Sequence, residues 1–211
     1  MSYCIAIPTI NRKDLLVDAL SWYLKKLPTT EIFVLDNGKQ GLLPADPLQR
    51  LRIFEPQSNL GVAGSWNWLM KTAIRFGYSN VLMLNDDVIL QRDESEICAL
   101  IDKGDLNTFH RCRPFYNWSS FILRTSIYEK VGDFDENFKK CFFEDNDYEY
   151  RMRLAGVAIK YEDDLNPQVY RNSQTIEKNP LLGGYIENRE YYIKKWGGLP
   201  DSETYKTPFG I

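Results

Sequence analysis

Two adjacent acids follow an apolar run in the middle of the chain, in the order Asn85-Asp86-Asp87-Val88. Carboxylates at the end of a buried strand are unfavourable unless something neutralises their charge. A divalent cation such as Mg²⁺ or Mn²⁺ does so, and it also binds diphosphate oxygens. The alternative is a turn in which solvated aspartates cap the strand. The tetrad alone leaves both interpretations open.

A second group of acids occurs at Glu144-Asp145-Asn146-Asp147. Acids in the first turn of a helix can simply cap its amides and complement its dipole. They can also supply a general base that takes a proton from a substrate hydroxyl. A metal ion that stabilises the departing group removes the need for a second carboxylic acid.

Gly61 and Gly64 lie where a helix is predicted to begin, in the segment Asn59-Leu60-Gly61-Val62-Ala63-Gly64-Ser65. Glycines there let backbone amides approach a phosphate, or let the helix pack closely on a sheet. The segment is neither a dinucleotide fingerprint nor a P-loop, because the third glycine and the lysine are missing.

Aromatic side chains form a further group that can bind the flat faces of sugars and bases or fill a core. Its members are Trp66, Trp68, Phe115, Tyr116 and Trp118. At least half of them are expected to be core residues.

The elements that must position these residues alternate between strands and helices. Apolar runs predict strands at 3–8, 31–35, 51–54 and 81–84, and helical spacing predicts helices at 11–27 and 61–76. This alternation predicts an α/β fold with a largely parallel sheet and helices on both faces. Ligands of such sheets bind outside the carboxyl ends of the strands. The polar segments 9–12, 36–38 and 85–87 should therefore meet in one crevice.

The second half of the chain is less regular. Residues 107–121 are polar and aromatic with little periodicity, although 121–123 has the character of a strand. Helices are predicted at 125–131, 145–155 and 185–196, and a strand at 157–161. The chain has 211 residues, which suits one good-sized core and a single domain.

Composition excludes several functional classes. The net charge is −3 and no basic run is present, so we expect no nucleic-acid partner. No apolar stretch is long enough for a transmembrane segment, and no secretory signal precedes the first strand, which predicts a cytoplasmic protein. The four cysteines lack CxxC spacing and are expected to be free thiols. A lone histidine, His110, argues against His-rich zinc sites and Ser-His-Asp chemistry.

In their order and spacing the motifs resemble those of the family 2 inverting glycosyltransferases, which have the GT-A fold. The similar segments are Ile7–Arg12, Asp36–Gly38, Asn59–Asn67, Asn85–Val88, Gly132–Phe138 and Glu144–Arg151. The resemblance extends from about residue 3 to residue 172. A narrower resemblance is to the N-terminal transferase domains of chlorovirus proteins that build capsid glycans, which predicts that 1–211 is one catalytic domain of a longer protein.

The resemblance implies a mixed, mostly parallel sheet flanked by helices. Residues 1–105 would form the nucleotide-binding half and 106–211 the acceptor half. The donor would be a nucleoside-diphosphate sugar, with UDP-glucose or UDP-rhamnose as examples, and the acceptor a glycan or glycoprotein hydroxyl. The cofactor would be Mn²⁺ or Mg²⁺.

The resemblance also implies a role for individual residues. Asp87 would bind the metal, with Asp86 near the ribose or the metal, and Asp145 would be the base with Glu144 beside it. Trp118, Tyr116 and Asp147 would contact the acceptor. The donor-binding residues would be Pro8, Thr9, Asn11, Arg12, Asp36, Asn59, Gly64, Asn67, Asn85 and Asp86.

Two departures from the family pattern concern the metal. Asn85 stands where an Asp-x-Asp motif has its first acid, which predicts weaker metal binding or a shift toward Asp86. The segment Val169-Tyr170-Arg171-Asn172 lacks the histidine that many relatives carry there. Arg171 would offset phosphate charge instead.

Two other functions fit parts of the pattern. A nucleotidyltransferase shares the α/β sheet and acidic metal ligands, but it usually has a Gly-rich basic loop where this chain has Thr9-Ile10-Asn11-Arg12. A non-catalytic module that binds sugars or nucleotides would not need both the acidic pair and Glu144-Asp145. Turnover of a donor in the presence of a sugar acceptor separates these possibilities.

Overall fold

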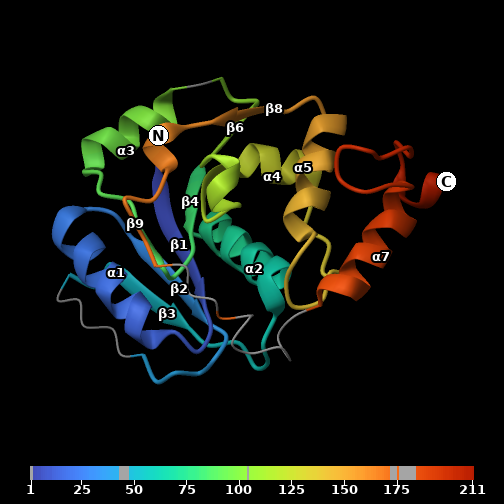
Figure 1. Cartoon of the computed structure of the whole chain (residues 1–211). Helices are drawn as coiled ribbons and strands as arrows, with labels where there is room; N and C mark the ends of the chain where they lie inside the picture. Colours follow the sequence, from blue (N-terminus) through green and yellow to red (C-terminus); the bar gives the residue numbers. More distant parts are fainter. Residues whose placement is uncertain (1, 43–47, 104, 172–174, 176–183) are drawn as a thin grey trace.

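The structure is a computed structural model that describes residues 2–42, 48–103, 105–171, 175 and 184–211 (Figure 1). Its strands are β1 (Tyr3–Thr9), β2 (Ile32–Asp36), β3 (Leu51–Phe54), β4 (Asn80–Leu84), β5 (Val88–Ile89), β6 (Thr108–Arg111), β7 (Ser120–Arg124), β8 (Ala158–Tyr161) and β9 (Val169–Tyr170). Its helices are α1 (Lys13–Lys26), α2 (Gly61–Arg75), α3 (Glu94–Asp102), α4 (Thr125–Val131), α5 (Glu144–Leu154) and α7 (Tyr185–Trp196). Short 3₁₀ turns occur at Pro114–Tyr116, Asp163–Leu165 and Pro208–Gly210.

A seven-stranded sheet in the order β3-β2-β1-β4-β7-β6-β8 runs through the molecule. Neighbouring strands are parallel except at β7, which is antiparallel to both β4 and β6. β5 and β9 form a separate antiparallel pair. The predicted α/β class with a mostly parallel sheet is confirmed.

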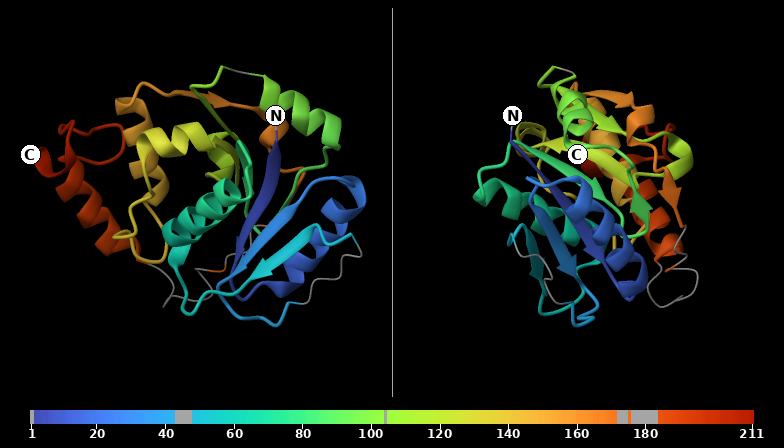
Figure 2. Two further views of the ribbon diagram at one scale, coloured as in Figure 1. Left: turned by 180° about the vertical axis from the view of Figure 1, so that it is seen from behind. Right: turned by 90° about the vertical axis from the view of Figure 1, so that its left-hand side faces the viewer.

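The two faces of the sheet are covered by different helices (Figure 2). Successive side chains of a strand point to opposite faces, so Ile5 and Ile7 of β1 pack on one side and Cys4 and Ala6 on the other. α1 and α3 cover the first side, while α2, α4 and α5 cover the second. The start of α2 lies next to the carboxyl end of β2, where the side chain of Asn37 accepts a hydrogen bond from the backbone amide of Leu60.

α7 forms a third packing layer outside α5 (Figure 1). Tyr192 and Trp196 of this helix are buried against Phe138 and Phe143, which lie before α5 in the chain. Within the described residues, none of the helices combines the length and apolar character needed to cross a membrane.

The predicted elements of the first half are present, with α1 beginning at Lys13 rather than at residue 11. The segment 107–121, predicted to be irregular, contains β6 and a 3₁₀ turn. All four residues of β6 are buried, so the alternation that marks a half-exposed strand is missing from its sequence. Strands β5 and β9 and helix α3 were not predicted either.

Candidate functional site

The carboxyl ends of β1, β2 and β4 meet at one edge of the sheet. Thr9 pairs with Asp36 in the parallel register of β1 and β2, and Asn85-Asp86-Asp87 directly follows β4. A cavity of about 180 Å³ opens there, which we call the strand-end pocket. It is lined by Pro8, Thr9, Ile10, Asn37, Asn59, Gly61, Val62, Ser65, Asn85, Asp86, Lys140 and Thr175.

A chain of hydrogen bonds joins the strand ends beneath this pocket. The Thr9 hydroxyl donates to Oδ2 of Asp86 at 2.6 Å, and Nε2 of Gln40 donates to the Thr9 hydroxyl at 3.4 Å and to Oδ1 of Asp36 at 3.0 Å. Burial raises the pKa of Asp86 to about 7, although the Thr9 hydrogen bond acts in the opposite direction. The ionised form of Asp86 is therefore stabilised by any cation that enters the pocket.

Asp86 is the member of the acidic pair that is placed to share a cation with a ligand in the strand-end pocket. No cluster of three or more His, Cys, Asp or Glu side chains suited to a metal exists within the described ranges. Mg²⁺ is commonly held by one or two carboxylates plus substrate phosphates and water, and the partly buried Asp86 lines the pocket. Asp87 is buried and adjacent, but it does not line the pocket. Both acids lie within electrostatic reach of Arg12, which is paired mainly with Asp14.

Asp36 is turned away from the strand-end pocket. Its fully buried carboxylate accepts hydrogen bonds from the backbone amides of Gly38 at 3.0 Å and Gln40 at 2.6 Å. The lining residue is instead its neighbour Asn37, which sequence analysis did not single out. Asn37 accepts from the amide of Leu60 at 3.1 Å and donates to the Ser65 hydroxyl at 2.8 Å, so it fixes the start of α2.

The predicted donor residues before and within α2 separate into two groups. Asn59 lines the pocket and accepts from the amide of Gly61 at 2.9 Å. Gly64 instead faces Leu60 and Glu136, to which an added Cβ would lie 3.0 and 3.6 Å away.

Asn67 is buried and binds other parts of the chain. Its amide donates to the carbonyl of Phe134 and to Glu136, and its oxygen accepts from Tyr128 and from the amide of Phe134. This arrangement does not bring Asn67 to the pocket.

Three further predicted positions do not line the strand-end pocket. Asn11 is exposed, has a positive φ of 55° and packs against Gly38, while Arg12 is partly buried beside Asp14. Arg171 pairs with Asp18 of α1 at 2.7 Å, and its backbone amide donates to the carbonyl of Asp87. Asn172 is outside the described residues.

A second, larger cavity of about 670 Å³ adjoins the first, and we call it the α5 cavity. Val62 and Asn85 line both cavities, so the two are direct neighbours. The remaining lining residues are Trp66, Asn117, Trp118, Cys141, Phe142, Phe143, Glu144, Asp145, Asn146, Tyr185, Arg189, Leu199 and Pro200. The mixture of aromatic rings, amides and charges is suited to a polar ligand with apolar faces.

Glu144 and Asp145 in the first turn of α5 face this cavity. Burial is the main cause that raises the pKa of each carboxyl, and the charge of Asp145 raises that of Glu144 further. The charge of Arg111 acts in the opposite direction on Asp145. Oε2 of Glu144 is buried and has no hydrogen-bond partner in the described part of the chain. A carboxylate with a raised pKa is a better proton acceptor near neutral pH.

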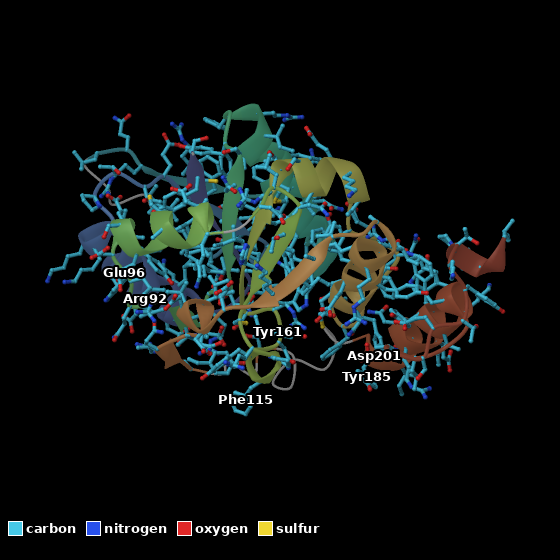
Figure 3. All side chains as sticks on the ribbon, turned by 90° about the horizontal axis from the view of Figure 1, so that it is seen from above. Arg92, Glu96, Phe115, Tyr161, Tyr185 and Asp201 are labelled. Atoms are coloured by element: carbon cyan, nitrogen blue, oxygen red, sulfur yellow. The ribbon has the colours of Figure 1, made fainter. Side chains whose placement is uncertain are left out.

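The three predicted acceptor residues have different surroundings. Trp118 is 4% exposed and stacks on Trp66, with one edge in the wall of the α5 cavity. Tyr116 packs against Tyr170 and lines neither cavity. The neighbouring Phe115 is 82% exposed and points away from the body of the molecule (Figure 3).

Asp147 is fully buried and does not reach either cavity. Its carboxylate pairs with Lys195 at 2.6 Å and with Arg151 at 2.8 Å, and accepts from the indole of Trp196 at 2.8 Å. Its contacts tie α5 to α7.

Two basic residues that were not predicted supply positive charge to the cavity walls: Lys140 lines the strand-end pocket and Arg189 lines the α5 cavity. Neither residue lies in a recognisable motif, so only the folded chain brings them there. Tyr185, by contrast, begins a helix that the sequence predicts.

No protein-family model matches the sequence, and no curated protein matches it. Solved structures are similar in fold. GalNAc-T7 with UDP, GalNAc and Mn²⁺ has a TM-score of 0.67 at 11% identity over 93% of this chain. The mannosyltransferase PcManGT from Pyrobaculum calidifontis, in complex with GDP-Man and Mn²⁺, has a TM-score of 0.59 at 15% identity over 78%. TarS from S. aureus has a TM-score of 0.57 at 18% identity over 81%.

The chain spans 48%, 55% and 36% of these three proteins, respectively. At such low identity the likeness concerns the fold, and function has to be argued from the site itself. The sheet order, the crevice at the strand ends and these likenesses agree. The chain has a GT-A-type glycosyltransferase fold.

Proposed function

We propose that this chain is an inverting, family 2 type glycosyltransferase that moves a sugar from a nucleoside-diphosphate sugar to a hydroxyl of a glycan. The observation that carries the proposal is the junction of the two cavities. Asp86 lies in the strand-end pocket, Asp145 lies in the α5 cavity, and Val62 and Asn85 line both. A donor in the first cavity would thus present its sugar to an acceptor in the second.

The strand-end pocket would take the nucleoside and the diphosphate. Asn37 and Asn59 offer amide groups at its wall, and Lys140 offers a positive charge. Asp86 and Asp87 would hold the cation, and bound Mn²⁺ or Mg²⁺ would supply charge that stabilises the departing diphosphate. Two structures of similar fold contain a nucleotide ligand together with Mn²⁺, which supports this assignment.

Asp145 would act as the general base. As the acceptor oxygen bonds to the anomeric carbon, the bond from that carbon to the diphosphate breaks, and the hydroxyl proton passes to the Asp145 carboxylate. This single displacement inverts the anomeric centre. Burial raises the pKa of the Asp145 carboxyl and so makes it a stronger base, and the charge of Glu149 acts in the same direction.

UDP-glucose and UDP-rhamnose are the first donors to test, and capsid-type glycans are the first acceptors. All four cysteines are free thiols, which agrees with a reducing compartment, and we place the reaction in the cytoplasm.

The Asp145→Asn variant tests the proposal. Loss of the base should lower kcat by about 100- to 10,000-fold, while the UDP dissociation constant changes by less than about threefold because the strand-end pocket is untouched. Transfer is measured by release of UDP with a sugar acceptor, and donor binding by calorimetry. Asp102→Asn, an exposed acid at the end of α3, is the matched control.

Equal losses of donor binding and transfer in Asp145→Asn would contradict the assignment of the base. Release of pyrophosphate from a nucleoside triphosphate and a sugar phosphate would identify a nucleotidyltransferase instead. Donor binding without turnover in the wild type would identify a non-catalytic binding module.

A further inference from the structure

The segment 139–143, just before Glu144 and Asp145, has an unusual backbone. Three of its residues are not glycine and still have positive φ angles, which are 64° at Lys140, 80° at Phe142 and 71° at Phe143. Such residues are unfavourable on their own and persist only where the surrounding structure holds them. The contacts of this segment therefore reveal what holds it.

Asn188 of α7 is the main contact. Its side-chain amide donates to the backbone carbonyls of Lys139 at 2.9 Å, Cys141 at 2.8 Å and Phe142 at 3.0 Å. Its side-chain oxygen accepts from the amide of Lys139 at 3.0 Å. The residue is only 2% exposed, so a single buried side chain binds backbone groups of three residues of the segment.

The start of α7 is shaped to allow this contact. Gly184, which precedes the helix, lies so close to the segment that an added Cβ would be 2.9 Å from the Lys139 carbonyl oxygen. Figure 1 shows the loop before α5 reaching this end of α7. Farther along the helix, Lys195 pairs with Asp135 at 2.7 Å and with Asp147 at 2.6 Å. The helix is thus anchored at a second point, independently of Asn188.

The same segment forms walls of both cavities. The carbonyl of Lys140 accepts from the amide of Val62 at 2.7 Å, at the start of α2, and Lys140 lines the strand-end pocket. Phe143 is the N-cap residue immediately before α5, so its conformation sets the direction in which Glu144 and Asp145 project. A shift of the segment would move Glu144 and Asp145 relative to the strand-end pocket.

We propose that Asn188 is a positioning residue, which holds segment 139–143 in its strained conformation and thereby aligns Asp145 in the α5 cavity with the strand-end pocket. Asn188 lines neither cavity and acts only through this backbone. The inference rests on the proposed function for its catalytic consequence, whereas the hold on the segment is a property of the fold.

The Asn188→Asp variant tests the proposal. It keeps the shape of the side chain but replaces the amide donors by an oxygen, which would face three carbonyl groups. We expect kcat to fall by at least about tenfold through misplacement of the base, with the UDP dissociation constant within about threefold. Amide hydrogen exchange at 139–145 should become at least about tenfold faster, with no change in β1 and β4.

Two further variants separate positioning from general destabilisation. Gly184→Ala places a Cβ against the Lys139 carbonyl, next to the Asn188 amide, and should give the same selective loss of kcat. Glu190→Gln, on the exposed side of α7, should change neither kcat nor exchange. The pH dependence of kcat should also change in Asn188→Asp, because Asp145 becomes more accessible to water.

Unchanged exchange at 139–145 in Asn188→Asp would overturn the proposal, as would a loss of kcat that only follows the unfolded fraction measured by circular dichroism. A wild-type chain that binds UDP but transfers no sugar would contradict the proposed function. In that case the exchange measurement would still decide whether Asn188 holds the segment.

Discussion

At the scale of single residues, the ionisation of Asp86 connects the stability of the fold with pH. Its carboxyl group lies in the strand-end pocket, where burial raises its pKa to about 7. Near neutral pH the protonated and ionised forms then coexist when no cation is present. Because a cation would bind only the ionised form, we expect protons and a divalent cation to compete for this residue.

The raised pKa of Asp86 predicts how stability depends on pH. In the unfolded chain the group loses its proton near the ordinary aspartate pKa of 3.8, whereas in the folded chain it keeps the proton until about pH 7. The folded state binds more protons between these values, so without divalent cations its free energy of unfolding should fall as the pH rises through this range. The full effect is about 4 kcal/mol.

Asp86→Asn cannot titrate and should lose most of this dependence, so that it is more stable than the wild type at pH 8 in the absence of metal. Urea denaturation at about pH 5 and pH 8 measures the difference. Asp102→Asn should keep the wild-type slope. An unchanged slope in Asp86→Asn would show that another group is responsible.

At the scale of elements, the start of α2 is a point of close contact between the two halves of the chain. Gly61 has a φ of 69°, and an added Cβ would lie 3.0 Å from the carbonyl oxygen of Lys140 and 3.1 Å from its Cα. The amide of the next residue, Val62, donates to the same carbonyl. Only a glycine provides both the left-handed conformation and the space for this contact.

Gly61→Ala should therefore lower the free energy of unfolding by more than backbone strain alone would. Gly77 is a matched control, because it has a φ of 81° but no atom within 4 Å of an added Cβ. Gly77→Ala should lower the free energy of unfolding by about 1–2 kcal/mol through strain alone. Gly61→Ala should lower it by more and should also weaken UDP binding, because Lys140 is displaced. Equal effects of the two variants on stability and on UDP binding would contradict the role given to the Lys140 contact.

At the scale of the whole molecule, the strand-end pocket joins distant parts of the chain. Its walls come from β1, the segment after β2, α2, the segment after β4, and Lys140 from the second half. A ligand that contacts all of them binds only the folded state and should raise the melting temperature of the whole sheet.

UDP at a concentration of about 100 times its dissociation constant should stabilise the fold by about 2.7 kcal/mol, which raises the melting temperature by about 5–10 °C for a chain of this size. Mn²⁺ should increase the shift in the wild type. Asp87→Ala should remove only the part that depends on Mn²⁺, as measured by thermal denaturation with Mn²⁺ or with a chelator. A loss of the UDP shift that is the same under both conditions would instead indicate a defect in the fold.

The sequence by itself determined the strands β1 to β4, the helices α1 and α2, and their consequence, a crevice at the ends of β1, β2 and β4. Apolar runs and helical spacing report burial on one side of an element, which is local information. Helix α3 also has a local signal in its sequence, because Asp93 and Glu96 form a capping box at its start. β6 had no such signal because all of its residues are buried.

Only the tertiary structure decided which side chains line the site. Asp36 and Asn37 are neighbours in a polar turn. The Asp36 carboxylate accepts a hydrogen bond from a backbone amide of that turn, whereas Asn37 lines the strand-end pocket. Asn67 forms hydrogen bonds with the backbone of Phe134, and Lys140 reaches the strand-end pocket from a distant segment. Local patterns report which residues are polar or apolar. They do not report the partner of a polar group, because that partner is set by contacts between segments far apart in the chain.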